Sequence, residues 1–240
     1  MVNKESGILY LVATPIGNLE DITFRAVRIL REVDFVICED SRRSKTLLAH
    51  FDIRKPIRIL HDHTSQSKLQ TFIAELQAGA RSALISDAGT PLISDPGFPL
   101  VRGLIRVGVR VEAVPGPTAF VNALIVSALP AHSFTFVGFL PPKEKARRDM
   151  LGEFVHERRT LIFYESPYRI LRTLKDMIDV LGDRQASVSR EMTKKFEETV
   201  RGTLSSILSH FENKKILGEW VIVVSGQRPQ VEERDHESEA

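Results

Sequence analysis

The stretch Ser86-Asp87-Ala88-Gly89-Thr90-Pro91-Leu92-Ile93-Ser94-Asp95-Pro96-Gly97 directly follows the apolar run Ala83-Leu84-Ile85. The short apolar run predicts a buried strand over 83–86, and the Gly and Pro residues predict a loop at its carboxyl end. In open α/β sheets, ligands bind outside the carboxyl ends of the strands. The stretch therefore predicts both a fold class and the position of a site.

Two more Gly/Pro loops follow predicted strands in the same way. Thr14-Pro15-Ile16-Gly17-Asn18-Leu19 comes after the apolar run 8–12, and Pro115-Gly116-Pro117-Thr118 comes after 109–114. Glycine lets the main chain approach a ligand closely, and proline holds a loop in one conformation. Each loop alone is equally well explained as a tight turn. Three of them at one sheet edge favour a ligand site.

The first half of the chain alternates strand-length apolar runs with amphipathic helical patterns. This order is typical of an α/β domain with a mostly parallel sheet that helices cover. We expect strands at 8–12, 35–38, 57–60, 83–86 and 109–114, and helices at 23–31, 69–76, 100–107 and 119–129.

The second half has a different pattern. Residues 186–190 and 197–202 are separated by too few residues for a crossover helix, so they predict an antiparallel hairpin in a mixed sheet. The other expected strands are 134–139, 160–164 and 220–225. We expect an N-terminal α/β domain at 1–118, a C-terminal α/β domain at 119–228 and a disordered acidic tail at 229–240.

The composition is that of a soluble globular protein, with 42% apolar and 27% charged residues among 240. The net charge is only +2, but residues 42–58 hold six basic side chains against Asp52 alone, which predicts contact with a polyanion. A single cysteine, Cys38, and the lack of a secretory signal or a membrane-spanning run predict a cytoplasmic protein.

Several common enzyme motifs are missing from the sequence. It has no phosphate-binding Gly-x-x-x-x-Gly-Lys-Ser/Thr loop, no Gly-x-Gly-x-x-Gly after a strand, no His-Glu-x-x-His and no Gly-x-Ser-x-Gly. These absences argue against ATPases of the phosphate-loop class, dinucleotide dehydrogenases, zincins and serine hydrolases. His61-Asp62-His63 lacks a third ligand at a set spacing, so we predict no metal.

Eight strings resemble those of bacterial enzymes that methylate the ribose 2′-oxygen of a cytidine in small-subunit (16S) ribosomal RNA. These enzymes belong to the tetrapyrrole methylase superfamily, and the resemblance covers about residues 8–226. The strings are Thr14-Pro15-Ile16-Gly17-Asn18-Leu19-Glu20-Asp21-Ile22-Thr23, Cys38-Glu39-Asp40-Ser41-Arg42, the stretch 86–97, Val114-Pro115-Gly116-Pro117, Gly138-Phe139-Leu140-Pro141, Phe163-Tyr164-Glu165-Ser166-Pro167, Arg190-Glu191-Met192-Thr193-Lys194 and Gly218-Glu219-Trp220.

The resemblance implies two α/β domains of the tetrapyrrole methylase type, with S-adenosylmethionine in the cleft between them. It also implies a cytoplasmic homodimer that acts on 16S ribosomal RNA, within the small ribosomal subunit. The implied cofactor-binding residues are Pro15, Ile16, Gly17, Asn18, Ser86, Asp87, Ala88, Gly89, Thr90, Pro91, Ile93, Ser94, Pro115, Gly116, Pro117, Thr118, Ala119, Tyr164, Glu165 and Pro167.

Methyl transfer to a ribose hydroxyl needs a base or a cation that stabilises the developing alkoxide. Asp40 is the favoured base and Glu39 its alternative, because Asp40 adjoins the basic run. Lys194 is the favoured cation, with Arg190 as the alternative. The competing interpretation makes Asp40 the N-cap of a solvated basic helix.

Six basic residues are predicted RNA contacts. Arg42, Arg43 and Lys45 suit phosphates more than bases. The RNA-binding surface could continue over Lys143, Arg147 and Arg148. Equally well, these three residues form a solvated helix face. Trp220, in contrast, is expected to pack in a core or a dimer interface more than to stack on a base.

Two other functions stay open at this point. A methylase of a tetrapyrrole-like small molecule would usually carry Gly-Asp-Pro where this chain has Gly89-Thr90-Pro91. A noncatalytic RNA-binding assembly factor would not need the intact Gly/Pro loops.

Overall fold

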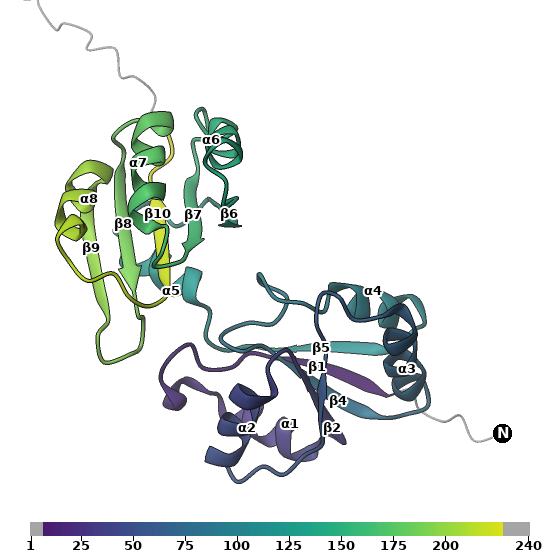
Figure 1. The fold of residues 1–240 in the computed structure, drawn as a ribbon. Helices are drawn as coiled ribbons and strands as arrows, with labels where there is room; N and C mark the ends of the chain where they lie inside the picture. Colours follow the sequence, from purple (N-terminus) through teal and green to yellow (C-terminus); the bar gives the residue numbers. More distant parts are fainter. Residues whose placement is uncertain (1–6, 228–240) are drawn as a thin grey trace, which may run out of the picture. The chain divides into compact units, whose positions relative to one another are not determined.

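The computed structural model describes residues 7–227 and divides them into two compact units (Figure 1). Unit 1 takes in the chain up to Asn122 together with the segment Met192–Phe196, and unit 2 takes in the rest. The division falls inside a helix, Ala119–Val126 (α5), whereas the sequence-based boundary lies after residue 118. The predicted acidic tail at 229–240 lies outside the described residues.

The sheet of unit 1 is entirely parallel. Its strands lie in the order β3-β2-β4-β1-β5, the open α/β arrangement expected from the sequence. The strands are β1 (Ile8–Val12), β2 (Phe35–Cys38), β3 (Ile57–Ile59), β4 (Arg81–Ile85) and β5 (Arg110–Val114). The helices are α1 (Phe24–Glu32), α2 (Ser41–His50), α3 (Gln66–Gln77) and α4 (Phe98–Arg106), with a short 3₁₀ helix at Leu19–Asp21.

Helices cover both faces of this sheet, which explains why its central strands are apolar on both sides. The helices α1 and α2 bury Leu30 and Leu48 against one face. On the other face, α3 and α4 bury Phe72 and Leu104. Because the strands run parallel, their carboxyl ends all meet at one edge of the sheet.

Unit 2 holds the mixed sheet, in the order β6-β7-β10-β8-β9. Its strands are β6 (Phe134–Phe139), β7 (Thr160–Glu165), β8 (Gln185–Arg190), β9 (Glu198–Thr203) and β10 (Trp220–Val224). β6 and β7 are parallel, the other neighbours are antiparallel, and β8 and β9 form the predicted hairpin. The helices are α6 (Glu144–Gly152), α7 (Ile170–Leu181) and α8 (Leu204–Glu212).

The core of unit 2 forms where these three helices pack on the sheet. Trp220 on the central strand is 1% exposed and meets Phe211 of α8 edge to face, with ring centroids 4.9 Å apart. Edge-to-face contacts add to the stabilisation from burial. The prediction that Trp220 packs in a core is confirmed.

Candidate functional site

The loops after β1 and β4 are tied together by main-chain hydrogen bonds. The Thr14 amide donates to the Gly89 carbonyl at 2.9 Å, and the Gly89 amide donates back to the Thr14 carbonyl at 3.0 Å. The Thr14 hydroxyl also donates to the Ser86 carbonyl at 3.0 Å. Two loops that are far apart in sequence therefore hold each other in one arrangement.

The loop after β5 joins them through side-chain hydroxyls. The hydroxyls of Thr90 and Thr118 lie 2.6 Å apart, and Thr90 also donates to the Pro117 carbonyl at 3.3 Å. Position 116 requires glycine, because an added Cβ would lie 2.9 Å from the Cβ of Ala13, closer than two such atoms pack. All three predicted loops thus meet at the carboxyl edge of the parallel sheet.

The loop 86–97 has an unusual backbone. Gly89 has a φ of +87°, and the non-glycine residues Leu92 and Ser94 also adopt positive φ values of 71° and 64°. At non-glycine residues such conformations cost about 1–3 kcal/mol each, and they cluster at ligand-binding sites. The loop is therefore strained in a way that a simple tight turn does not require.

Ser86 and Asp95 close this loop from inside. The Ser86 hydroxyl donates to the Asp95 carboxylate, and the same hydroxyl oxygen accepts from the Ala88 amide at 3.1 Å. Burial raises the pKa of the Asp95 carboxyl, the Ser86 hydrogen bond opposes the rise, and the carboxylates of Glu39 and Asp87 add to it. This edge of the sheet is therefore rich in carboxyl groups.

Asp40 is the N-cap of α2. Its carboxylate accepts from the Arg42 amide at 2.8 Å and pairs with the Arg42 guanidinium at 2.7 Å. These Arg42 hydrogen bonds lower the pKa of Asp40 to about 2. The N-cap interpretation is confirmed, and so low a pKa makes Asp40 a weak base; Glu39 lies beside it, exposed at the end of β2.

The basic residues predicted on α2 face solvent. The Arg42 side chain is 89% exposed and the Arg43 side chain 59% exposed, and Lys45 is exposed as well. Arg43 Nε lies 3.8 Å from Asp87 Oδ2, which is an ion pair but not a hydrogen bond. The α2 surface thus carries cations beside the three loops.

The segment Met192–Phe196 brings Lys194 to the loop after β1. The Asn18 amide donates to the Thr193 hydroxyl at 3.1 Å. A Cβ at Gly17 would collide with the Lys194 side chain and lie 2.8 Å from the Thr193 hydroxyl. The absent side chain of Gly17 therefore makes room for Lys194.

Arg190, the alternative cation, is engaged within unit 2. Its guanidinium pairs with Glu198 at 2.8 Å and lies 5.6 Å from the centroid of the Trp220 ring. His210 and Lys214 also bind Glu198, and the Lys214 hydrogen bond is the main reason that the pKa of Glu198 falls to about 2. Arg190 is thus part of a charge cluster that holds the β8–β9 hairpin.

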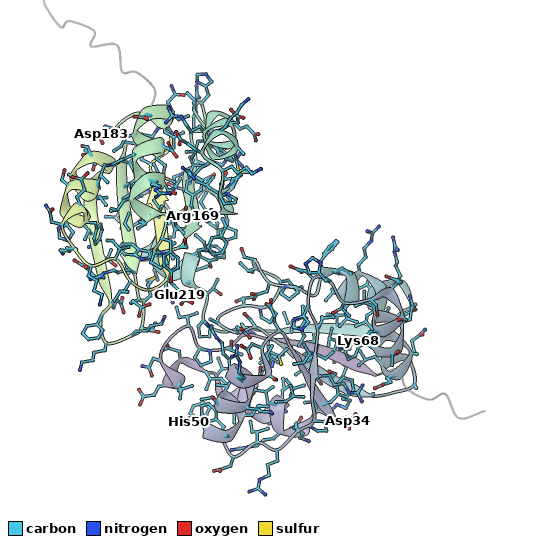
Figure 2. The ribbon with its side chains drawn as sticks, viewed as in Figure 1. Asp34, His50, Lys68, Arg169, Asp183 and Glu219 are labelled. Atoms are coloured by element: carbon cyan, nitrogen blue, oxygen red, sulfur yellow. The ribbon has the colours of Figure 1, made fainter. Side chains whose placement is uncertain are left out.

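Glu165 stabilises the loop between β7 and α7 in unit 2. Its fully buried carboxylate pairs with Arg169 at 2.7 Å and accepts from the Ser166 amide at 2.7 Å and the Thr173 hydroxyl at 2.6 Å. Arg169 is labelled in Figure 2. These donors surround the carboxylate, so Glu165 stabilises the turn into α7. Tyr164 and Pro167, on either side of it, are partly exposed.

The expectation for Arg147 is corrected. Its side chain is 4% exposed and pairs with Asp176 of α7 at 2.6 Å, so it has no surface to offer RNA. Arg148 pairs with Asp176 and Asp179 at the surface, and only Lys143 of the three is freely exposed. A buried ion pair between two helices, which no local pattern indicated, explains the difference.

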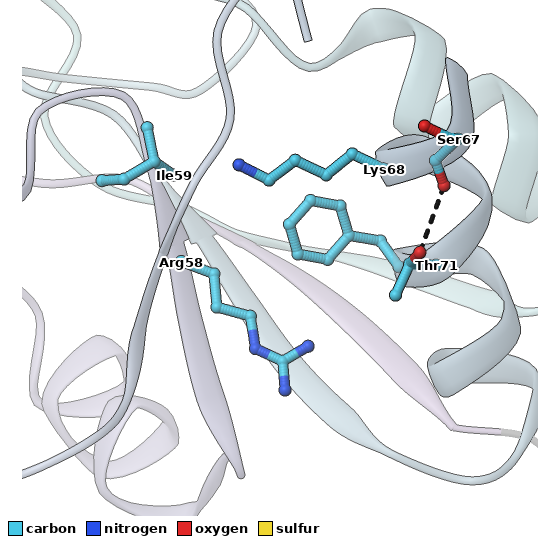
Figure 3. A pocket seen from close by; sticks show the side chains of 6 residues that line it. Arg58, Ile59, Ser67, Lys68 and Thr71 are labelled. Carbon is cyan, nitrogen blue, oxygen red and sulfur yellow. Dashed lines mark hydrogen bonds between the residues drawn. The ribbon is translucent and has the colours of Figure 1, made fainter. Parts of the chain in front are cut away.

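Several hollows of unit 1 are large enough for part of a ligand, among them one of about 350 Å³ between α3 and α4. The α2 hollow, of about 250 Å³, is lined by Pro15, Leu19, Arg43, Ser44, Thr46, Leu47, Ser86 and Asp87. The β3 hollow, of about 420 Å³, is lined by Arg58, Ile59, Ser67, Lys68, Thr71 and Phe72. Figure 3 shows Lys68 of the β3 hollow extending from α3 toward Ile59, and Thr71 hydrogen-bonded to Ser67.

The α2 hollow touches two of the three loops. Pro15 of the loop after β1 lines it, as do Ser86 and Asp87 of the loop after β4. The β3 hollow lies at the sheet's edge strand, and its Arg58 pairs with Glu75 and stacks on Phe35. The α2 hollow is therefore the one that belongs to the candidate site.

Sequence reasoning missed three residues of the site. Thr14 and Asp95 lie inside quoted strings but were not assigned roles, and Thr193 was passed over for its neighbour Lys194. Thr14 and Thr193 contribute hydrogen bonds to loops that are distant in sequence, and Asp95 contributes one within its own loop. No local signal marks such bonds. Among residues 7–227, no three His, Cys, Asp or Glu side chains are grouped to hold a metal, and no helix is long and apolar enough to cross a membrane.

Comparison with known proteins adds a family to this geometry. The family model described as tetrapyrrole (corrin/porphyrin) methylases matches residues 8–208. A solved structure of uroporphyrin-III C-methyltransferase from Thermus thermophilus, complexed with S-adenyl homocysteine, superposes with a TM-score of 0.59 and 23% identity. The match covers 90% of this chain and 97% of that one, so the two share a fold.

Two curated relatives are much more similar in sequence. Ribosomal RNA small subunit methyltransferase I of Halalkalibacterium halodurans is 48% identical, over 95% of this chain and 79% of that protein. The protein of the same name from Thermotoga maritima is 46% identical, over 92% of this chain and 99% of that protein. Both alignments extend over nearly all of this chain.

Proposed function

This chain belongs to the tetrapyrrole (corrin/porphyrin) methylase family, and within it we propose an S-adenosylmethionine-dependent methyltransferase of small-subunit (16S) ribosomal RNA. The observation that carries the proposal is 48% identity over 95% of the chain to a protein named for that activity. The acceptor in this proposal is the 2′-oxygen of a cytidine ribose, as the sequence resemblance implies. Such a substrate locates the activity in the bacterial cytoplasm.

The three loops of unit 1 fit the cofactor. Gly89 leaves an opening that a Cβ would fill, since that atom would lie 3.3 Å from Ile16 Cγ2 and 3.6 Å from the Pro117 carbonyl oxygen. The carboxyl groups of Glu39, Asp87 and Asp95 near the same edge suit a ligand with a positive centre. S-adenosylmethionine carries that centre as its sulfonium, which supplies the methyl group.

The chain's own task is to orient the acceptor and take away its proton. The chain would align the acceptor oxygen with the methyl carbon that S-adenosylmethionine would supply; S-adenosylhomocysteine would leave, and the hydroxyl proton would pass to water. Lys194, held over Gly17, is suited to stabilise negative charge on the oxygen. Asp40 would mainly hold Arg42 and the start of α2, because the pKa of its carboxyl is about 2.

RNA fits the exposed cations of α2 better than a tetrapyrrole does. Arg42, Arg43 and Lys45 lie on one helix beside the cofactor loops, where they would contact phosphates and position the strand. A tetrapyrrole is compact, so even its carboxylates would contact few of the cations along this exposed helix face. A noncatalytic assembly factor would have no use for the strained loop 86–97.

The proposal extends to assembly in two respects. The substrate is 16S ribosomal RNA within the small ribosomal subunit, and the active form is a homodimer. These points rest on the sequence resemblance.

The experiment is methyl transfer with a labelled donor. The protein is incubated with S-adenosylmethionine labelled in its methyl group and with small ribosomal subunits, free 16S ribosomal RNA or a uroporphyrin-type tetrapyrrole. Label is expected in the RNA of the subunit sample, of the free-RNA sample or of both. No label is expected in the tetrapyrrole. Label in the tetrapyrrole alone would contradict the proposal, and calorimetry that finds no binding of S-adenosylmethionine would favour the assembly factor.

A further inference from the structure

The α2 hollow has the size and walls of a site for one flat ring. Its volume is about 250 Å³, below the roughly 300–1,000 Å³ of sites that bury whole drug-sized ligands. Pro15, Leu19 and Leu47 provide apolar walls. The hydroxyl of Ser44, which also lines it, already donates to the Asp40 carbonyl at 3.0 Å. The hollow therefore suits a planar group smaller than the whole cofactor.

Its charged groups are Arg43 and Asp87, and both have hydrogen-bonding capacity left. Asp87 Oδ1 accepts from the Asp40 amide at 3.2 Å, which fixes the carboxylate. Asp87 Oδ2 lies 3.8 Å from Arg43 Nε, too far for a hydrogen bond. Within residues 7–227 no hydrogen bond runs from the Arg43 guanidinium to another group. One acceptor and several donors therefore stand side by side at the hollow.

We infer that the α2 hollow receives the cytosine base of the target nucleotide, and that Asp87 and Arg43 read its edge. Cytosine offers an amino group beside two acceptors, N3 and O2. The amino group would donate to Asp87 Oδ2, and the Arg43 guanidinium would donate to N3 and O2. This inference rests on the proposed function, whose substrate is a cytidine.

The same pair of side chains rejects uracil. Uracil has a carbonyl oxygen where cytosine has its amino group, so that oxygen would face the Asp87 carboxylate with no proton between them. A buried polar group left without a partner is costly, and a good pair of contacts to a base edge discriminates by about 1–3 kcal/mol. The base must leave its stack for this contact, as in other enzymes that act on a single nucleotide.

A base of the RNA fits this hollow better than the adenine of the cofactor does. Of the proposed cofactor contacts, Pro15, Ser86 and Asp87 line the hollow, whereas the segments 88–94 and 115–119 line no part of it. Four of its eight lining residues come from α2, which carries the exposed cations of the RNA face. Arg43, for which the sequence predicted a phosphate contact, is thereby assigned to the base.

The first test changes the substrate and uses the wild-type protein. Reconstituted small subunits contain 16S ribosomal RNA with cytidine, uridine or the riboside of 2-pyrimidinone, which is cytosine without its amino group, at the target position. We expect kcat/KM to fall by roughly 10- to 100-fold for the last two. Equal kcat/KM for all three RNAs would overturn the inference and leave the proposed function intact, whereas no methylation of any RNA would remove both.

The second test uses variants and the ratio of kcat/KM for cytidine over uridine. Asp87 also belongs to the proposed cofactor loop, but a loss of cofactor binding affects both RNAs alike and cancels in the ratio. We expect the ratio to approach one in Asp87→Asn and in Arg43→Gln. The matched control, Arg42→Gln, removes a neighbouring cation and should weaken both reactions without changing the ratio.

Cofactor affinity tests whether the adenine of S-adenosylmethionine occupies the hollow instead of the cytosine. Calorimetry of Arg43→Gln with S-adenosylmethionine should give the wild-type dissociation constant. A weakened constant together with an unchanged ratio would put the adenine of the cofactor in the hollow and overturn the inference.

Discussion

Thr14 and Gly89 exchange two main-chain hydrogen bonds, of 2.9 and 3.0 Å, across 75 positions of sequence. The pairing is an isolated antiparallel bridge between loops that follow two neighbouring parallel strands. It holds Gly89, with its φ of +87°, beside Ile16 and Pro117 of the two neighbouring loops. The geometry of the proposed cofactor site therefore depends on this bridge.

Gly89→Val should abolish binding of S-adenosylmethionine in a protein that still folds. The new side chain would crowd Ile16 and fill the opening, and the positive φ adds a cost of roughly 1–2 kcal/mol in unfolding free energy. Gly108→Val is the matched control, because Gly108 has a φ of +77° but open space around it. Calorimetry and urea unfolding measure both effects. A folded Gly89→Val protein with undiminished affinity would refute the cofactor assignment.

The fold was predictable because its signals are local. Apolar runs such as Phe35–Cys38 and Trp220–Val224 identify strands, and the short distance between β8 and β9 requires a hairpin. The order of the strands then follows the rules for parallel sheets. The all-parallel first sheet and the mixed second sheet match this expectation.

The side-chain roles were harder to predict, because they depend on partners far along the chain. Nothing near Arg147 indicates that Asp176, 29 positions later, will bury its charge. The contact between Asn18 and Thr193 spans 175 positions. Asp40 was ambiguous for a different reason, since one carboxylate next to Arg42 suits both a cap and a base.

Asp40→Asn should leave most of the turnover at neutral pH intact. The Arg42 hydrogen bonds keep the folded-state pKa near 2, below the ordinary value of 3.8, so Asp40 holds a proton poorly. Because the pKa is lowered on folding, the stabilising pair is fully present above about pH 4 and is lost as the pH falls toward 2. The difference in unfolding free energy between wild type and variant should shrink over that range. A loss of turnover of about 100-fold or more at pH 7 would restore Asp40 as the base.

Arg147→Met should destabilise unit 2 and leave the RNA face unaffected. Breaking a buried ion pair costs about 3–5 kcal/mol, and the remaining pair between Arg148 and Asp176 puts the expected loss at the lower end. Arg148→Met, whose side chain is 37% exposed, serves as the control and should cost under about 1 kcal/mol. Urea unfolding measures both. Equal losses in the two variants would contradict the buried pair.

Arg42→Ala and Lys45→Ala should each lower the salt dependence of RNA binding. On single-stranded RNA, the slope of log affinity against log salt should fall by about 0.7 for each lost phosphate contact. Arg28→Ala on α1 is a control of equal charge, since Arg28 pairs with Glu32 away from the site. Filter binding over a salt series gives the slopes, and wild-type slopes in both variants would reduce α2 to a solvated helix face.

The most direct test of the account is the position of the methyl group on the product RNA. Small ribosomal subunits from cells that lack the protein are treated with the purified protein and S-adenosylmethionine, and the 16S ribosomal RNA is mapped by nuclease digestion and mass spectrometry. The account predicts one new 2′-O-methylcytidine, and none when the target cytidine is replaced by its 2′-deoxy form. A methyl group on a base, or continued methylation of the 2′-deoxy RNA, would contradict it.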